Sequence, residues 1–356
     1  MPEAVLVVGG GPAGLEAAGG LADLGMPVIL VEQRDRLGGT PDAAYYAALT
    51  PSLESAEEAL DRMRAHVVDR PEVTLHLESR VISRTRESDT GPFTVAIEHR
   101  DGSTTEVTAG AVILTTGFQH FDPGRETQMY GYYEHADVIT LVDAEKMLHD
   151  HKFVRPSTGE TPQSVAFIQC VGSRDRRIGN EYCSKVCCGV ASKEAIEIRK
   201  LLPDTRVYIF YIDMRMYGYW ENMIYWPAQE EYNVTYVRGI VTEIVKRDGR
   251  LLMKGEDTTM GRPMEVLMDV IVLSVGMEPS QGTRAMADVF GVGQNKYGFI
   301  ATPGEPMDPV STDTPGVFVA GAAAGPKDLE DTVGMAGSAV MKAVRFLRRT
   351  APAAVS

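Results

Sequence analysis

The sequence is short of positive charge and has no long hydrophobic run. Among its 356 residues, 49 are acidic and 35 are basic, which gives a formal net charge of −14. Because binding to a phosphate backbone requires a basic surface, no nucleic acid partner is expected, and non-specific attraction to anionic membranes is disfavoured. No apolar stretch approaches the ~20 residues that cross a bilayer, so no membrane span is expected either.

Cysteine is also scarce, and its distribution is uneven. The chain has only four cysteines, and all of them lie within residues 170–188. The first residues, Met1-Pro2-Glu3, lead directly into an apolar strand, without the basic segment and long apolar core of a signal peptide. We therefore expect a cytoplasmic protein, in which cysteines stay reduced and serve chemistry more often than crosslinking.

The opening of the chain follows the pattern of a dinucleotide-binding unit. Gly9-x-Gly11-x-x-Gly14 stands between a short apolar strand and a helix. The first glycine permits a tight turn, the second lets the backbone approach a pyrophosphate, and the third allows close helix–strand packing. The helix start offers free N–H groups to phosphates. Glu32 ends the next strand, where a carboxylate accepts from ribose hydroxyls and repels the 2′-phosphate of NADP. The alternative is a glycine-rich turn without a ligand.

Apolar runs and turn residues predict a second unit of the same kind. A β-rich stretch follows the first unit, and a polar segment then leads into a new strand, helix and strand. A last strand and a long helix complete the first unit. We therefore expect an α/β protein with two domains, the first formed by 1–150 together with 286–356 and the second by 151–285. The expected strands are 5–8, 28–31, 73–77, 80–84, 93–99, 104–107, 111–115, 164–170, 206–211, 239–246, 251–254, 270–275 and 316–320, and the later expected helices are 52–68, 189–202 and 331–348.

The second unit has cysteines where a second glycine loop is expected. Cys170-Val171-Gly172-Ser173-Arg174 occupies that place, so direct nicotinamide binding is expected to be lost. Buried structural thiols and a redox disulfide are two interpretations of the cysteines, although no C-x-x-C is present. Structural zinc and an iron–sulfur cluster are the others. The start of a helix close to the cysteines favours an anionic, thiolate-bound cluster. The spacing is Cys170-x12-Cys183-x3-Cys187-Cys188.

Four ordered segments resemble the FAD-contact segments of thioredoxin-reductase-like flavoproteins. This resemblance implies FAD and a fold of two Rossmann-like, three-layer domains of the two-dinucleotide-binding type. One segment departs from that pattern, because Ala320-Gly321-Ala322 stands where those proteins have Ala-Gly-Asp, with the aspartate on the ribityl chain. The four segments are Gly9–Gly14, Arg36-Leu37-Gly38-Gly39-Thr40, Thr115-Thr116-Gly117 and Thr314–Gly321.

Further motifs resemble the A subunit of heterodisulfide reductase over essentially the whole chain. That resemblance implies an electron-transfer subunit with FAD and a [4Fe–4S] cluster, which acts as a homodimer with other subunits of a complex. We expect the additional cluster domains of methanogen-type subunits to be absent, because the sequence begins at the first dinucleotide-binding strand and has no further cysteines. In this it resembles the short form in heterodisulfide-reductase-like complexes of cytoplasmic sulfur oxidation. The motifs are Ile168–Arg174, Tyr182–Cys188, Tyr211-Ile212-Asp213-Met214-Arg215 and Gly325-Pro326-Lys327-Asp328.

The resemblances imply a set of site residues. Lys327 lies shortly before the last helix, where a positive charge beside the flavin would raise its reduction potential; a solvated surface lysine is the alternative. The expected metal ligands are Cys170, Cys183, Cys187 and Cys188. The expected flavin contacts are Gly9, Gly11, Pro12, Ala13, Gly14, Glu32, Gln33, Gly38, Gly39, Thr40, Val81, Thr116, Gly117, Gly321, Ala322, Lys327, Asp328 and Thr332.

The aromatic segment 208–236 predicts an interface, because tryptophan and tyrosine concentrate at such surfaces. A homodimer is the first expectation for it. Two other functions are open: a stand-alone NADH-dependent flavoprotein disulfide reductase, and a non-catalytic scaffold with structural FAD. NADH oxidation by the isolated chain is the observation that separates the first of these from an electron-transfer subunit.

Overall fold

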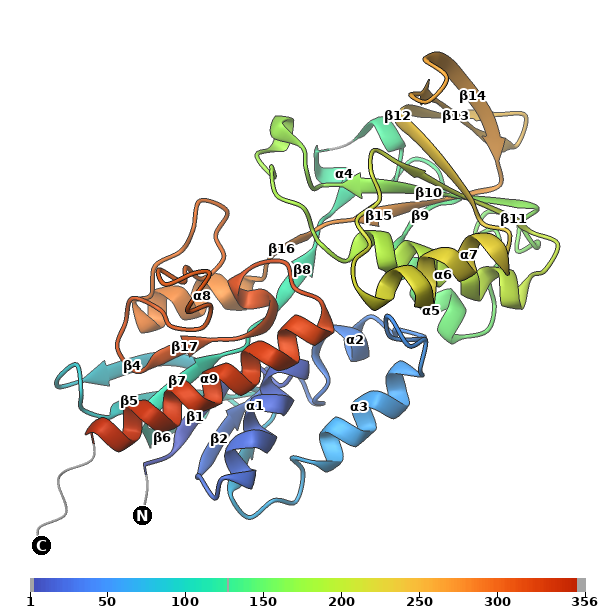
Figure 1. Ribbon diagram of the computed structural model, residues 1–356. Coiled ribbons are helices and arrows are strands. Elements are labelled where there is room, and N and C mark those ends of the chain that lie inside the picture. The colour runs from blue at the N-terminus through green and yellow to red at the C-terminus, as the bar shows by residue number, and fades with distance from the viewer. Residues whose placement is uncertain (1–2, 127, 351–356) are drawn as a thin grey trace, which may run out of the picture. The chain divides into compact units, whose positions relative to one another are not determined.

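The computed structural model describes residues 3–126 and 128–350, which form two compact units (Figure 1). The first unit is drawn from Met1–Ala43, Glu58–Gln119 and Glu278–Ser356, and the second from Ala44–Glu57 and His120–Met277. The sequence places the boundaries near 150 and 285 instead. The difference arises because β9 (Val138–Thr140) pairs with β15 (Val270–Val275) of the second unit, so the chain has already entered that unit well before residue 150.

The first unit is built on a five-stranded parallel sheet in the order β17-β7-β1-β2-β3. Its inner strands are continuous apolar runs that are buried on both faces, as parallel sheets require. Helices α1 and α9 pack on one face (Figure 1). The elements are β1 (Val5–Val8), α1 (Pro12–Asp23), β2 (Val28–Val31), β3 (Val73–His76), β7 (Ala111–Leu114), β17 (Val317–Val319) and α9 (Leu329–Thr350).

An antiparallel sheet and a helix cover the other face of that sheet, which makes three layers. Alternate residues of β1 divide between the layers: Val5 and Val7 pack toward α1 and α9, whereas Leu6 and Val8 pack toward Phe93 and its neighbours. The elements of this layer are β4 (Ser79–Arg86), β5 (Phe93–His99), β6 (Thr104–Ala109) and α8 (Gln281–Phe290), and the smaller elements of the unit are α2 (Gly39–Ala43), α3 (Ala56–Ala65) and η4 (Gly321–Ala324).

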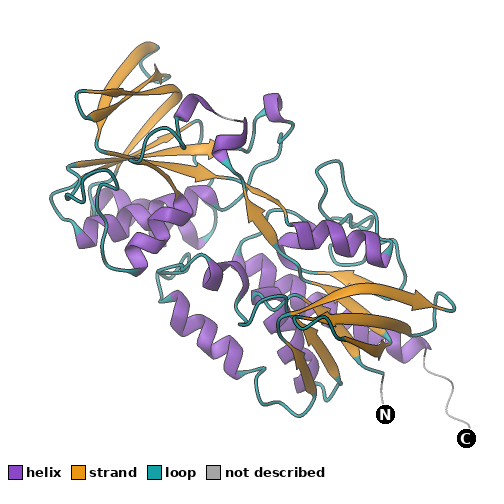
Figure 2. Ribbon diagram, turned by 180° about the vertical axis from the view of Figure 1, so that it is seen from behind, coloured by secondary structure: helices purple, strands orange, loops and turns teal. Residues whose placement is uncertain are grey.

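The second unit has a seven-stranded sheet in the order β14-β13-β12-β11-β10-β15-β9. Helices α5 and α6 cover one face, whereas residues of β12 and β13 pack on the other face, and Figure 2 shows the long strands of the β12–β14 extension away from the helices. The elements not yet given are α5 (Leu141–His149), β10 (Ser164–Val171), α6 (Cys187–Leu201), β11 (Arg206–Tyr211), η3 (Glu221–Tyr225), α7 (Trp226–Glu230), β12 (Thr235–Arg247), β13 (Arg250–Asp257) and β14 (Arg262–Met268), with the short α4 (Pro123–Glu126), η1 (Gln128–Tyr130) and η2 (Arg176–Ile178).

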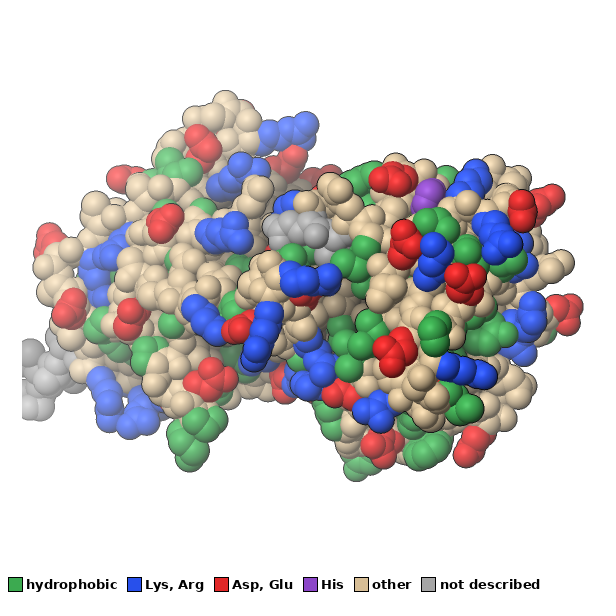
Figure 3. All heavy atoms as spheres, turned by 90° about the horizontal axis from the view of Figure 1, so that it is seen from above, with side chains coloured by type: hydrophobic (Ala, Val, Ile, Leu, Met, Phe, Trp, Pro, Cys, Tyr) green, Lys and Arg blue, Asp and Glu red, His purple; other side chains and the backbone are tan. Residues whose placement is uncertain are grey.

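Two short strands, β8 (Phe118–His120) and β16 (Met277–Pro279), pair with each other where the chain passes from one unit to the other. The architecture confirms the predicted α/β fold with parallel sheets. In the described ranges, no helix combines the length and the apolar character that a bilayer span requires. Acidic and basic side chains are interspersed over the face drawn in Figure 3.

Candidate flavin and cysteine sites

The first glycine loop is held in place by close backbone packing. Gly9 has a positive φ of +112°, and a Cβ atom there would lie 2.5 Å from the Thr115 carbonyl oxygen. A Cβ on Gly14 would lie 1.8 Å from the Gly9 carbonyl oxygen, so the helix packs directly against the strand end. Gly11 is the N-cap of α1, and no side chain caps that helix and no acidic residue lies in its first turn. The helix start therefore remains open to an anion.

The second glycine pair lies backbone to backbone against the first loop. A Cβ on Gly39 would lie only 2.6 Å from Gly11 Cα, and the Gly39 φ of +62° independently favours glycine. The Gly38 N–H donates to the Gly10 carbonyl oxygen at 2.8 Å. Two motifs far apart in the sequence thus form one cradle, which side chains would fill. These residues fit the pyrophosphate of a dinucleotide.

Glu32 closes one side of this cradle. Its carboxylate is 6% exposed, and Oε2 accepts the Gly10 N–H at 2.6 Å while Oε1 accepts the Arg34 N–H at 2.9 Å. The Glu32 carboxylate thereby holds the glycine loop in place. It also lies at the position that contacts a ribose in such folds. Charge-assisted hydrogen bonds of this kind are about twice as strong as neutral ones.

Thr115 is a positioning residue that is not among the flavin contacts expected from the sequence. Its hydroxyl donates to the carbonyl oxygens of Val8 and Gly9, at 2.9 and 2.8 Å, and so ties β7 to the glycine loop. The predicted neighbour Thr116 bonds Thr283 through the two hydroxyls at 2.7 Å. The signal for Thr115 was available, because it directly precedes Thr116 at the end of a buried strand.

The C-terminal segment meets the start of α1. A Cβ on Gly321 would lie 3.0 Å from Ala13 Cβ and 3.2 Å from Thr332 Cγ2, so these three predicted contacts come together. Asp328 is 6% exposed, and its Oδ1 accepts the Asp331 N–H at 2.7 Å. Asp328 therefore caps α9, which begins at Leu329, about two residues before the predicted start.

The remaining predicted flavin residues have diverse surroundings. Val81 is 4% exposed and belongs to the core between the two sheets of the first unit, so its side chain packs inward. Gln33 is exposed, whereas Thr40, Ala322 and Lys327 are half-buried. The others, Pro12 in the first turn of α1 and Gly117 after β7, lie on the segments described above.

Three of the four cysteines come together at the start of α6. Cys187 and Cys188 open that helix and are buried, and the Cys187 thiol is hydrogen-bonded to both Cys188 and Cys170. Cys170 lies near the end of β10, where the register with β15 shifts, and has a φ of +64°. Cys183 is half-buried, and its sulfur accepts the Lys185 N–H at 3.3 Å.

The thiols of Cys170 and Cys187 differ in pKa. The hydrogen bond from Cys187 and the Arg174 guanidinium, whose Nη1 lies 3.9 Å from Cys170 Sγ, lower the pKa of Cys170 to about 7. Donation to Cys170 and to Cys188 raises the pKa of Cys187 well above its usual value. Arg174 is itself bound by Asp213, at 3.1 Å between Nη2 and Oδ2, which brings the Asp-Met-Arg motif to the cysteine loop. A thiolate is therefore available at neutral pH.

The expected four-cysteine metal site is not assembled in this arrangement. Within the described ranges, no group of three or more His, Cys, Asp or Glu side chains is placed to hold a metal ion. The three clustered thiols and the low pKa of Cys170 suit a thiolate ligand set, whereas Cys183 has its hydrogen bond within its own loop. Cysteine thiolates are the usual ligands of iron–sulfur centres, so the residue types fit such a centre.

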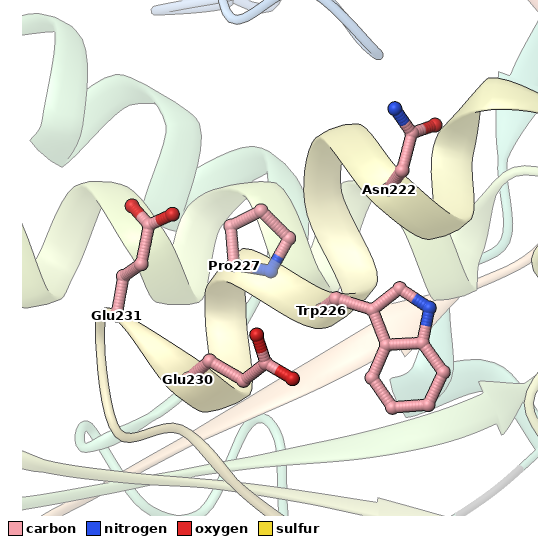
Figure 4. A pocket seen from close by; sticks show the side chains of 5 residues that line it. All are labelled: Asn222, Trp226, Pro227, Glu230 and Glu231. Carbon is pink, nitrogen blue, oxygen red and sulfur yellow. The ribbon is translucent and has the colours of Figure 1, made fainter.

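An open pocket of about 460 Å³ lies on the aromatic segment of the second unit (Figure 4). It is formed by one face of η3 and α7, and Trp226 is 47% exposed beside it. None of the predicted cofactor residues lies in this pocket. Its lining residues are Asn222, Trp226, Pro227, Glu230 and Glu231.

The two Rossmann-type units and the double glycine cradle define a flavoprotein of the two-dinucleotide-binding class. Solved thioredoxin reductases share this fold. The T. acidophilum enzyme superimposes with a TM-score of 0.64 at 20% identity, over 96% of this chain and 97% of that one. The Lactococcus lactis enzyme gives 0.65 at 19% identity, over 98% and 99%. At such identities the likeness establishes the fold alone.

The chain belongs to the pyridine nucleotide-disulphide oxidoreductase family, whose model matches residues 3–345, and it is an oxidoreductase. Its relatives include A subunits of heterodisulfide reductases. The subunit from Methanothermobacter thermautotrophicus is 38% identical over 70% of this chain and 38% of its own length. The subunit from Methanosarcina acetivorans is 31% identical over 96% of this chain and 53% of its own length. The chain thus spans about half the length, or less, of these two relatives.

Proposed function

We propose that this protein is an electron-transfer subunit of a heterodisulfide-reductase-like complex, with FAD in the first unit and a [4Fe–4S] cluster in the second. The proposal rests on one difference between the two units, in the groups that lie at the same place in the fold. The first unit has a double glycine cradle, whereas at the corresponding strand end of the second unit the Cys187 thiol is hydrogen-bonded to the thiols of Cys170 and Cys188. A nucleotide cradle is thereby replaced by groups that ligate metals.

When bound, FAD would exchange electrons in pairs or singly. The protein would bind the flavin and adjust its reduction potential. Gly11 and Gly39 let the pyrophosphate approach the backbone, and the uncapped start of α1 binds its charge. Glu32 holds the loop and accepts from the ribose. Lys327, half-buried just before α9, would favour negative charge on the reduced flavin.

The cysteine site is proposed to pass electrons singly. Cys170, Cys183, Cys187 and Cys188 would bind the cluster through their thiolates. Arg174 would balance part of the negative charge, because it already lies against Cys170. The start of α6 favours thiolate ligands at Cys187 and Cys188 for the same electrostatic reason.

The test is electron paramagnetic resonance of the protein purified without oxygen and then reduced. A cluster signal is expected in the wild-type chain and is expected to be lost or altered in both Cys170→Ser and Cys183→Ser. FAD content should be unchanged in these variants, because the cysteines and the glycine cradle belong to different units. Bound zinc, or thiols oxidised to disulfides without iron, would refute the cluster assignment.

The same preparation tests the second candidate, a stand-alone NADH-dependent disulfide reductase. The family match favours it, because relatives of this family use pyridine nucleotides. The cysteine loop at residues 170–174 argues against it, since it lacks the glycine pattern that binds a second dinucleotide. Rapid reduction of the flavin by NADH in the isolated chain would favour the reductase over the proposed subunit.

We further propose a cytoplasmic homodimer that works with other subunits in sulfur oxidation. The exposed aromatic side chains of the second unit support an interface, with Tyr219 at 74% and Trp226 at 47% exposure. The sulfur-oxidation setting rests on the resemblance alone. Sedimentation of the wild-type chain and of Trp226→Ala is the test of the dimer, and a monomeric wild-type chain would refute it.

A further inference from the structure

Charged side chains from three segments of the first unit meet beside its second glycine motif. Asp42 belongs to α2, Arg64 belongs to α3, and Arg34 and Arg36 lie between β2 and α2. The Asp42 carboxylate forms ion pairs with all three guanidinium groups, at 3.0 Å from Arg34 Nη2 and 3.2 Å from Arg36 Nε. Its side chain is only 8% exposed, so Asp42 is the buried centre of this arginine cluster.

Two of the arginines also bind the backbone of the motif. Arg64 Nε donates to the Leu37 carbonyl oxygen at 2.9 Å. Arg34 Nη1 donates to the Gly39 carbonyl oxygen at 3.1 Å. The peptide group between Leu37 and Gly38 is held at its other end as well, because the Gly38 N–H donates to the first glycine loop. The motif is therefore bound both by the arginine cluster and by the first glycine loop.

The two glycines of the motif need such support from their surroundings. Gly38 and Gly39 have φ values of +127° and +62°, which other residues rarely adopt. A Cβ on Gly38 would lie 2.6 Å from Arg64 Nη2 and 2.7 Å from Asp42 Cβ, so the arginine cluster packs directly on this residue. Glycine loses more conformational freedom on ordering than any other residue. A pair of glycines therefore needs external contacts to hold one conformation.

Asp42 keeps two arginines in the geometry that binds the motif. A guanidinium group has five donors and no acceptor, so Arg34 and Arg64 can be bridged only by an acceptor placed between them. The Asp42 carboxylate is that acceptor, and without it the two like charges would repel each other. Asp61 also pairs with Arg64, at 2.7 Å from Nη1, but it belongs to the same helix and is 62% exposed. Asp61 therefore does not tie α3 to the motif.

We propose that Asp42 is a positioning residue for the pyrophosphate of a bound dinucleotide: through Arg34 and Arg64, it fixes the second glycine motif before the ligand binds. The inference rests on the proposed function, since a dinucleotide has to occupy the cradle. A cradle that is already ordered binds more tightly, because ligand binding does not have to order the loop. A carboxylate by itself disfavours a nearby anion, so the contribution of Asp42 is geometric.

Asp42→Asn separates geometry from charge, because the two predict opposite changes in affinity. The substitution keeps the shape of the side chain and removes a negative charge near the cradle, which by electrostatics alone would strengthen the binding of an anion. Loss of the bridge instead leaves two glycines to be ordered on binding, at about a tenfold loss of affinity for one or for each. The dissociation constants of FAD and ADP, titrated into the full chain after its flavin is removed, should therefore rise about 10- to 100-fold.

Asp61→Asn is the matched control, because it removes the same charge from a partner of the same arginine. Its affinity for FAD and ADP should equal or exceed that of the wild type. Arg34→Lys keeps the positive charge but loses the planar pair of donors that reaches Gly39 and Asp42, so it should weaken both ligands about tenfold. Unchanged or tighter binding in Asp42→Asn overturns the proposal, as does an equal loss in Asp61→Asn. If Asp42→Asn does not fold, Arg34→Lys decides by the same criterion.

Hydrogen–deuterium exchange shows whether the motif is ordered before the ligand binds. In the flavin-free wild type the amides of residues 36–42 should exchange slowly. In flavin-free Asp42→Asn they should exchange faster, and saturation with FAD should slow them again. Equal exchange of this segment in the two flavin-free proteins overturns the proposal. A wild-type chain that binds neither FAD nor ADP refutes the proposed flavin site and the positioning role together, whereas equal binding by the wild type and Asp42→Asn refutes the positioning role alone.

Discussion

Replacing Gly11 by alanine should separate flavin binding from folding. Gly11 has a φ of −77°, which any residue adopts, and an added Cβ would meet only Gly39 Cα, at an ordinary contact distance of 3.5 Å. The folded chain without flavin should therefore change in stability by less than ~1 kcal/mol, which is typical of a substitution that creates no clash. The new methyl group, however, projects into the cradle between the two glycine motifs.

The loss of affinity follows from the hydrogen bonds that the pyrophosphate would give up. Hydrogen bonds to charged groups contribute about 1.5–3 kcal/mol each. If the methyl group displaces the phosphates from two backbone N–H donors, affinity falls by ~3–6 kcal/mol, or roughly 10²- to 10⁴-fold. Flavin fluorescence measures the dissociation constant, and urea denaturation of the flavin-free protein measures the stability.

Gly337→Ala is the matched control for this experiment. Gly337 lies on an exposed face of α9, and a Cβ there would contact nothing. Alanine should stabilise the helix by about 0.5–1 kcal/mol and leave flavin affinity unchanged. The reasoning would be refuted if Gly11→Ala bound FAD as tightly as the wild type, or if it unfolded the flavin-free chain as much as it weakened binding.

Three further outcomes are expected. Thr115→Val removes the hydroxyl that bonds the Val8 and Gly9 carbonyls, so the free energy of unfolding should fall by ~1–3 kcal/mol in urea titrations, and FAD affinity should fall with it. Lys327→Ala should lower the flavin reduction potential in a spectroelectrochemical titration, and an unchanged potential would leave this residue as a surface lysine. Burial raises the pKa of Glu194 well above its ordinary value, so the folded state binds more protons than the unfolded state, and stability should decline as the pH rises from about 4.3, by up to ~1.4 kcal/mol per pH unit. In Glu194→Gln, stability should fall less steeply as the pH rises. A pH profile of stability equal to that of the wild type would contradict the raised pKa of Glu194.

Local patterns in the sequence predicted much of the first unit. The strands 5–8, 28–31 and 93–99 match the structure residue for residue, because an apolar run bounded by turn residues marks a buried strand clearly. The two glycine motifs are short signals with a strict geometric cause, and the contact between Gly11 and Gly39 gives them a common structural basis.

Features that depend on tertiary contacts could not be predicted from local patterns in the sequence. The segment 44–57 follows a motif of the first unit but belongs to the second, through contacts such as that of Ala47 with Glu145. Helix α6 begins at Cys187, two residues before the predicted start, because cysteine gives no helix-start signal in the sequence. Lys193 and Glu194 have the composition of a solvated helix face, and only the packing of α5 on α6 buries them.

The most direct test of the account is the ratio of iron, acid-labile sulfide and FAD in the chain purified without oxygen. The account predicts iron and sulfide in the proportions of one [4Fe–4S] cluster for each FAD. Stoichiometric FAD with zinc, or with neither metal nor sulfide, would contradict the central claim. That claim is that the second unit has a thiolate-bound redox centre where the first unit has a nucleotide cradle.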